Sequence, residues 1–183
     1  MRLIDDARQG ILYGYEASNF SKSTTFVVFM YLGAVGVTAI AFLAWLSRTV
    51  DNVPALGGGR PSVTPRWSIG WWFIPFANLV KPYQIVRDVH DRMAMRPGSG
   101  GGWVVTAWWA LWVLGNVIYG VSTLLPEPKD FDALATFHSI KGTANALTFL
   151  SAVLAIAVVL RIQWRADERA DELGARATQT APA

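Results

Sequence analysis

The stretch from residue 60 to residue 93 reads RPSVTPRWSIGWWFIPFANLVKPYQIVRDVHDRM, and it decides how the rest of the chain is interpreted. Its apolar part, residues 67–80, has no charged side chain and would extend about 21 Å as a helix. A full crossing of the hydrocarbon layer needs about 20 residues, or ~30 Å. Pro75 and Pro82 each lack a backbone donor and are expected to bend the helix. The stretch is therefore predicted to be a short, proline-bent membrane helix over about 67–93, amphipathic beyond Lys81.

Three longer uncharged segments place the chain among membrane proteins. Residues 23–47, 97–126 and 142–160 contain no Asp, Glu, Lys or Arg, and only 16% of the whole chain is charged. A soluble domain carries about 25% charged residues. We therefore expect an all-α integral membrane bundle of four helices, at about 24–46, 67–93, 103–125 and 143–165.

The segments around these helices are predicted as follows. Residues 1–22 read as an N-terminal amphipathic segment at the membrane surface, followed by hydroxyl caps at Ser21 and Ser23. Residues 57–59 are three glycines, which indicate a structured turn, because a phosphate-binding loop would also need a lysine and a preceding strand. Residues 126–141 are expected to form a loop, and residues 166–183 a charged, partly disordered tail.

Two composition patterns suggest how the helices pack. Four tryptophans crowd the start of the third helix and predict an aromatic belt at the level of the lipid headgroups. Small residues follow one side of the last helix and predict a face that a neighbouring backbone can approach closely. The residues of the two patterns are Trp103, Trp108, Trp109 and Trp112, and Ala144, Thr148, Ser151, Ala152 and Ala155.

The distribution of basic residues predicts part of the membrane orientation. Lys and Arg prefer the cytoplasmic side. Eleven of the 16 basic residues are cytoplasmic if all four segments span and the N-terminus is inside. The same number is cytoplasmic if the central stretch dips in and returns, with the N-terminus outside. Residues 81–96 and the C-terminus are thus predicted inside and residues 126–141 outside, while both N-terminal placements stay open.

The central stretch also carries a family resemblance. The residues Gly70-Trp71-Trp72-Phe73-Ile74-Pro75-Phe76-Ala77-Asn78-Leu79 and Pro82-Tyr83-Gln84 follow a Pro/Gly-rich, basic loop. This pattern resembles the bacterial integral membrane proteins grouped as the domain of unknown function DUF4328, over roughly residues 25–165. The resemblance implies four transmembrane helices, which favours an N-terminus inside, and it implies no activity.

Little in the sequence points to catalysis or to a metal. The chain has no cysteine. Asp88, His90 and Asp91 form the one cluster of metal-ligating types, but on a helix His90 points away from the two carboxylates, so a solvated surface is expected. We therefore predict no catalytic residue, metal or cofactor, and the absence of a basic patch with interleaved aromatics argues against nucleic acid.

The function predicted from these observations is a multi-pass protein of the bacterial plasma membrane that serves as a non-catalytic structural or interaction module. Its expected partners are membrane lipids and a second copy or another membrane protein. The alternative is a unit for lipid binding, small-ligand binding or permeation, built around the proline-broken helix. Asn78 and Asn116 are its polar centre, since a bilayer amide needs a partner. Either Asn78 bonds a carbonyl freed by Pro82 or bonds Asn116, or the two amides form a polar spot in a small cavity. The full candidate set is Trp71, Trp72, Pro75, Asn78, Pro82, Tyr83 and Asn116.

Overall fold

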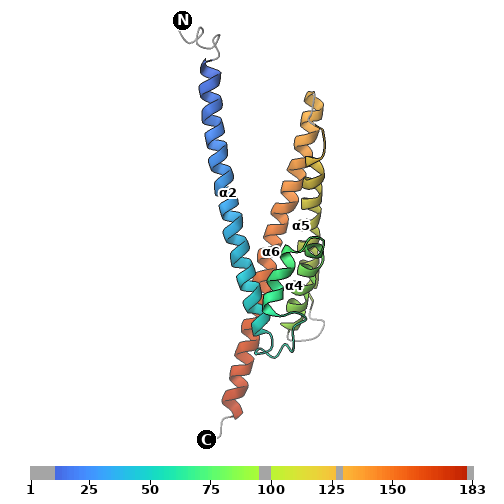
Figure 1. Cartoon of the computed structure of the whole chain (residues 1–183). Coiled ribbons are helices and arrows are strands. Elements are labelled where there is room, and N and C mark those ends of the chain that lie inside the picture. The colour runs from blue at the N-terminus through green and yellow to red at the C-terminus, as the bar shows by residue number, and fades with distance from the viewer. Residues whose placement is uncertain (1–10, 95–99, 127–129, 181–183) are drawn as a thin grey trace. The chain divides into compact units, whose positions relative to one another are not determined.

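The computed structural model describes residues 11–94, 100–126 and 130–180 (Figure 1). These residues are helical or lie in turns, and no strand occurs among them, which confirms the all-α prediction. Three helices are long and apolar enough to cross a membrane, within Thr25–Asn52, Gly102–Thr123 and Asp132–Gln179. The elements, with 3₁₀ helices marked η, are α2 (Ile11–Asn52), α3 (Pro65–Gly70), η1 (Trp71–Phe73), η2 (Ala77–Leu79), α4 (Lys81–Arg92), α5 (Gly102–Thr123) and α6 (Phe131–Thr180).

The chain forms two compact units, residues 1–45 and residues 46–183. In the first unit α2 runs without interruption from Ile11, because no proline or other strong breaker stands between that residue and the end of the helix. The prediction of a separate amphipathic helix ending at hydroxyl caps is therefore wrong for residues 11–22, since Ser21 and Ser23 lie inside α2. Residues 1–10 lie outside the described part.

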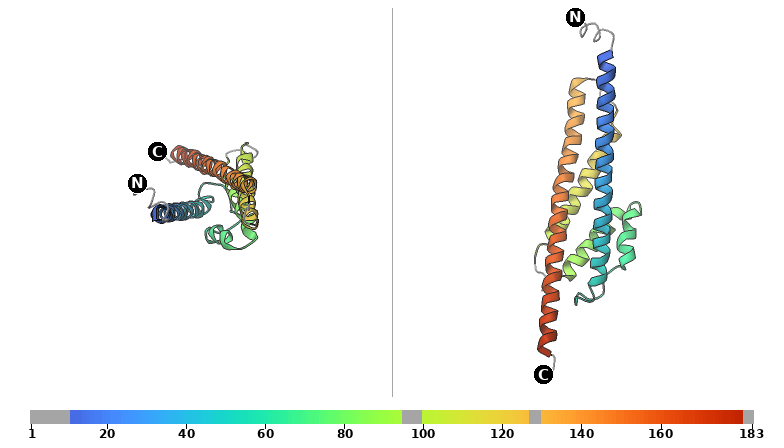
Figure 2. Two further views of the ribbon diagram at one scale, coloured as in Figure 1. Left: turned by 90° about the horizontal axis from the view of Figure 1, so that it is seen from above. Right: turned by 90° about the vertical axis from the view of Figure 1, so that its left-hand side faces the viewer.

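In the second unit, α5 and α6 run side by side (Figures 1 and 2). The approach is close at Gly115, where an added Cβ would lie 2.9 Å from the Thr148 hydroxyl oxygen and 3.2 Å from the Ala144 carbonyl oxygen. Ser151 is buried and donates to the Trp108 carbonyl at 3.2 Å. The predicted small-residue face of the last helix therefore packs against α5 at Ala144, Thr148 and Ser151, whereas Ala152 is exposed.

Helix α6 begins earlier and ends later than predicted. The Asp130 carboxylate accepts a hydrogen bond from the Ala133 N–H at 2.7 Å and so caps the first turn. The predicted loop 126–141 is helical from Phe131, and the predicted tail is helical as far as Thr180. Residues 181–183 lie outside the described part. The C-terminal part of α6 continues past the start of α5 (Figure 1).

The glycine run after α2 forms the predicted turn. Gly57 and Gly59 have φ angles of +72° and +75°, which only glycine adopts without strain. A Cβ at Gly58 would lie 2.7 Å from a methyl carbon of Val53, so this residue is also required to be small. The turn brings the chain from the end of α2 back to α3.

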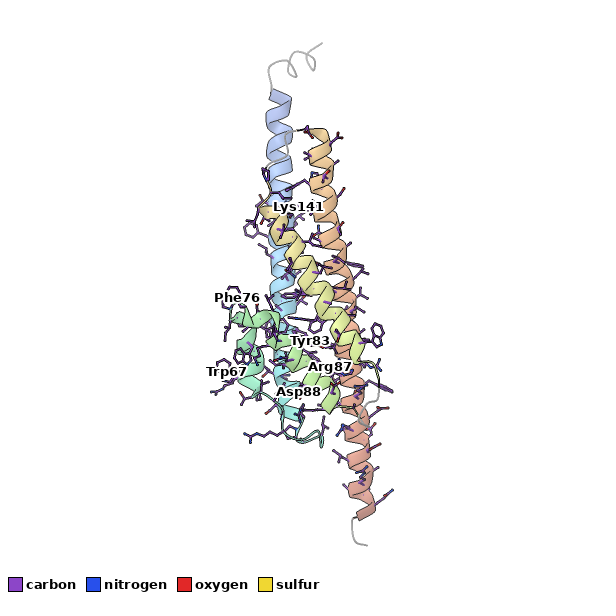
Figure 3. The ribbon with its side chains drawn as sticks, turned by 90° about the vertical axis from the view of Figure 1, so that its right-hand side faces the viewer. Trp67, Phe76, Tyr83, Arg87, Asp88 and Lys141 are labelled. Atoms are coloured by element: carbon purple, nitrogen blue, oxygen red, sulfur yellow. The ribbon has the colours of Figure 1, made fainter. Side chains whose placement is uncertain are left out.

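Residues 65–92 form a hairpin, which contradicts the prediction of one bent helix over 67–93. Pro75 removes a helical donor, and the following Phe76 adopts a φ angle of +62°, so the chain reverses between η1 and η2. Trp67 and Asp88 consequently lie at the same end and Phe76 at the other (Figure 3). Pro82 does not bend a helix but stands in the first turn of α4, where its missing N–H costs nothing.

Candidate functional site

Tryptophan side chains hold the hairpin against α5. The Trp109 indole N–H donates to the Leu79 carbonyl at 2.9 Å and thereby binds an acceptor that the broken helix leaves open. Trp72 meets the Trp109 ring edge-on, with centroids 5.8 Å apart, and Trp109 stacks on Trp112 at 4.7 Å. Of the four tryptophans predicted to form an aromatic belt, Trp108 and Trp109 are buried, Trp112 is half-buried and Trp103 is 68% exposed.

The two arms of the hairpin touch each other below the reversal. The Lys81 ammonium lies 5.4 Å from the Trp71 ring, within the range of a cation–π contact. At the base, the Ser62 N–H donates to the Asp88 carboxylate at 3.0 Å. An open pocket of about 260 Å³ lies between α4 and the segment that precedes the hairpin. Its lining residues are Ser62, Val63, Lys81, Gln84, Ile85 and Asp88.

The remaining predicted ligand residues do not converge. Tyr83 shares a hydrogen bond of 3.1 Å with the Thr106 hydroxyl of α5. Pro75 is exposed at the reversal, whereas Asn78 is half-buried. Asn116 donates to the Trp112 carbonyl of its own helix at 2.7 Å. Within the described residues no hydrogen bond joins Asn116 to Asn78, so of the predicted alternatives the Asn78–Asn116 bond is not formed.

His90 is buried, with 1% of its surface exposed, which contradicts the prediction that it is solvated. Asp91 is exposed, as predicted, and Asp88 is half-buried. Its Nδ1 lies 2.9 Å from an Asp91 carboxylate oxygen and its Nε2 lies 3.1 Å from Nη1 of Arg165. An ionised carboxylate can only accept, so Nδ1 carries the proton and Nε2 accepts from the guanidinium. Arg87 completes the chain of charges with a 2.8 Å ion pair to Asp91.

This environment changes the protonation of both His90 and Asp91. Burial lowers the pKa of His90, and the charge of Arg165 also lowers it, while the hydrogen bond to Asp91 acts in the opposite direction. Burial acts to raise the pKa of Asp91, but hydrogen bonds from Arg87 and His90 outweigh it and the pKa is lowered. The imidazole is therefore neutral and the carboxylate ionised near neutral pH.

Arginines at four-residue spacing on α6 bind the open carbonyls at the end of α4. Arg165 is 5% exposed and donates to the His90 carbonyl at 2.9 Å. Arg169 donates to the carbonyls of Met93 at 3.1 Å, Ala94 at 2.7 Å and Leu56 at 3.0 Å. The prediction of a solvated charged extension is therefore wrong for this part of α6. Spacing alone shows that Arg161, Arg165 and Arg169 share a face, but not what covers it.

The described residues contain no group of three or more His, Cys, Asp or Glu side chains that could hold a metal ion. No curated protein and no solved structure matches the chain. A family model does match, over residues 12–164, and its description is a domain of unknown function, DUF4328. Because the match covers most of the chain, including the hairpin, two of the long apolar helices and the first part of the third, the protein belongs to the DUF4328 family.

Proposed function

We propose that the chain is a multi-pass protein of the bacterial cytoplasmic membrane that acts as a non-catalytic interaction module through its hairpin, residues 65–92. Its partners would be membrane lipids and either a second copy or another membrane protein, and not nucleic acid. The three long apolar helices and the family membership support a membrane location. In this proposal the hairpin binds a partner and catalyses no reaction.

The observation that carries this proposal is the apolar tip of the hairpin. Phe73 and Phe76 are 72% and 86% exposed, although both are large and apolar. Backbone hydrogen bonds hold the tip in place despite the strained φ angle of Phe76, with the Ala77 N–H donating to the Pro75 carbonyl at 2.7 Å. Exposed apolar groups backed by a rigid scaffold are typical of contact surfaces.

The bond between Ser62 and Asp88 supports a re-entrant hairpin rather than a fourth crossing. It holds Ser62, just before the hairpin, within 3.0 Å of Asp88 in the second arm, which supports placing the two ends of the hairpin on the same side of the membrane. With three crossings and the excess of basic residues inside, the hairpin base and the C-terminus are cytoplasmic and the N-terminus is outside.

Single cysteines test this arrangement directly, since the natural chain has none. Ser62→Cys and Glu172→Cys should react with a membrane-impermeant maleimide only after the cells are opened. Asp130→Cys should react in intact cells. A four-span arrangement places Ser62 and Glu172 on opposite sides, so labelling of Ser62→Cys from outside would sink the re-entrant model.

Photo-crosslinking tests the contact function. A photoreactive amino acid replaces Phe76, and a matched control replaces Leu124, which is 83% exposed at the end of α5. In native membranes we expect a discrete protein adduct from position 76, either to a second copy or to one partner, and none from position 124. Lipid adducts alone at both positions would refute the protein-contact role and leave lipid contact.

A second candidate function is small-ligand binding in the pocket between α4 and residues 62–63. The pocket offers the Lys81 ammonium, the Gln84 amide and the Trp71 ring nearby. A ligand would be found by mass spectrometry of the protein purified from native membrane. Its loss in Lys81→Gln, with retention in the exposed control Arg176→Gln, would support this function. If the natural protein carries no bound ligand, this function is refuted.

A further inference from the structure

The N-terminus of α5 is open and built of glycines. The helix begins at Gly102 after Gly101, whose φ angle is +104°, and no side chain caps it. The first N–H groups of a helix lack partners within the helix and carry the positive end of its dipole. The amides of Gly102 and Trp103 therefore form the start of an anion-binding surface.

Three guanidinium groups from two other helices converge on these glycines. Arg161 and Arg165 of α6 donate to the Gly100 carbonyl at 2.9 Å and 3.0 Å. Arg87 of α4, labelled in Figure 3, donates to the Gly102 carbonyl at 2.9 Å. The convergence concentrates positive charge at the helix start, where the dipole has the same sign.

The glycines are what lets the arginines come so close. A Cβ at Gly101 would collide with the Arg161 guanidinium, and a Cβ at Gly102 would lie 2.5 Å from Cζ of Arg87. Both planar groups thus lie against bare backbone. Any side chain at these two positions would displace them.

The cluster has donor capacity that the described residues do not use. Arg161 donates from Nη2 to Gly100, but its Nε is buried and has no hydrogen-bond partner within the described part of the chain. A buried donor without an acceptor is costly and usually marks a group that binds water or an ion. Arg87 already has Asp91 as its acidic partner at 2.8 Å. We therefore expect an added anion to bind at Arg161.

The position of the cluster relative to the apolar helix favours a lipid. The membrane-spanning length of α5 begins at Gly102 itself, and Trp103 beside it is 68% exposed. Tryptophan prefers the boundary between hydrocarbon and headgroups. Basic pockets between transmembrane helices at this depth bind phosphate-containing headgroups.

We propose that Arg87, Arg161 and the first amides of α5 bind the phosphate group of an anionic phospholipid, while Arg165 holds the glycine segment in position. A free phosphate ion shares this chemistry, so the test must separate the two sources. The site lies away from the hairpin tip. If the contact function proposed above is refuted, the lipid-binding proposal is therefore unaffected.

Native mass spectrometry of the full chain in neutral detergent tests the proposal. The probes are dioleoylphosphatidylglycerol, dioleoylphosphatidylcholine and inorganic phosphate. We expect the natural protein to retain phosphatidylglycerol about tenfold better than phosphatidylcholine, and Arg161→Gln to lose about tenfold, as for one charge-assisted hydrogen bond. Arg176→Gln removes the same charge from an exposed site and should change nothing.

Three results would overturn the proposed binding of an anionic phospholipid. Equal retention of the two lipids by the natural protein overturns the proposal without any variant, so a poorly folded Arg161→Gln does not protect it. Equal loss in Arg161→Gln and Arg176→Gln also overturns it. Binding of inorganic phosphate that depends on Arg161, without retention of lipid, overturns the lipid assignment and gives the site to a soluble phosphate.

Discussion

Replacing Gly115 with leucine tests the close packing of α5 on α6. The position of an added Cβ lies 2.9 Å from the Thr148 hydroxyl and 3.2 Å from the Ala144 carbonyl, whereas ordinary contact begins at 3.4 Å. The helices must therefore separate along this face. Overpacking of this kind costs about 1–3 kcal/mol, and leaving glycine recovers up to about 1 kcal/mol of helix propensity. For a side chain as large as leucine we expect a net loss of about 2 kcal/mol.

The matched control is Gly120→Leu on the same helix, because an added Cβ there meets nothing within 4 Å. The assay is thermal unfolding in detergent, followed by helical circular dichroism. A loss of 2 kcal/mol should lower the apparent midpoint by about 4–8 °C for a chain of this size. Gly120→Leu should leave it unchanged or raise it. In Gly115→Ala, adding Thr148→Ala should restore part of the loss.

Equal shifts in the two leucine variants would refute the reasoning, since they would show a general cost of a large residue in α5. No shift in either variant would show that α5 and α6 do not approach each other as closely as Gly115 indicates. A shift at Gly115 that Thr148→Ala does not relieve would place the collision on the Ala144 backbone alone.

The same midpoint measurement checks three further predictions. The pKa of His90 is lowered from its ordinary value of 6.5, so the unfolded chain gains a proton before the folded chain does as the pH falls. The free energy of unfolding should therefore decrease from about pH 7 to 5.5. His90→Gln should remove this trend, and His138→Gln should keep it. Arg169→Gln leaves three carbonyls without their donor and should cost about 3 kcal/mol, against less than about 0.5 for exposed Arg176→Gln. Phe76→Gly relieves about 1 kcal/mol of backbone strain and should not lower the midpoint, whereas Phe76→Val should. A flat pH profile of the natural protein, a neutral Arg169→Gln or a destabilised Phe76→Gly would contradict the corresponding contact.

The sequence predicted what depends on composition and local spacing. The charge-free segments located the three long apolar helices, and the small residues on α6 identified the face that packs on α5. The prolines of the central stretch indicated a disturbed helix, but a missing donor does not determine whether the chain bends or reverses. That choice depends on Phe76, whose φ angle no local pattern requires. The start of α6 could have been found from Asp130, three residues before the N–H that it caps.

The burial of His90 and of the arginines on α6 could not be read from the sequence, because it depends on residues 75 positions apart. Locally, residues 88–92 and 161–169 are both polar helical segments that would be soluble on their own. Each becomes buried only against the other. The contacts of the candidate ligand residues are likewise long-range for Trp72 and Tyr83, which lie against α5, whereas Asn116 bonds within its own helix.

The density of specific residues in the central stretch follows from the reversal of the chain. A continuous helix binds its own carbonyls, but a broken one at membrane depth needs donors from elsewhere in the protein. Trp109 supplies one to Leu79 at the tip. At the base of the hairpin, Arg165 and Arg169 bind the carbonyls that the C-terminal end of α4 leaves open. These donors hold the hairpin against α5 and α6. The tip around Phe76 can therefore keep its conformation although no other part of the chain covers it. A segment that needed only to fill the bilayer would require none of this, which is why we assign the hairpin a role in contact.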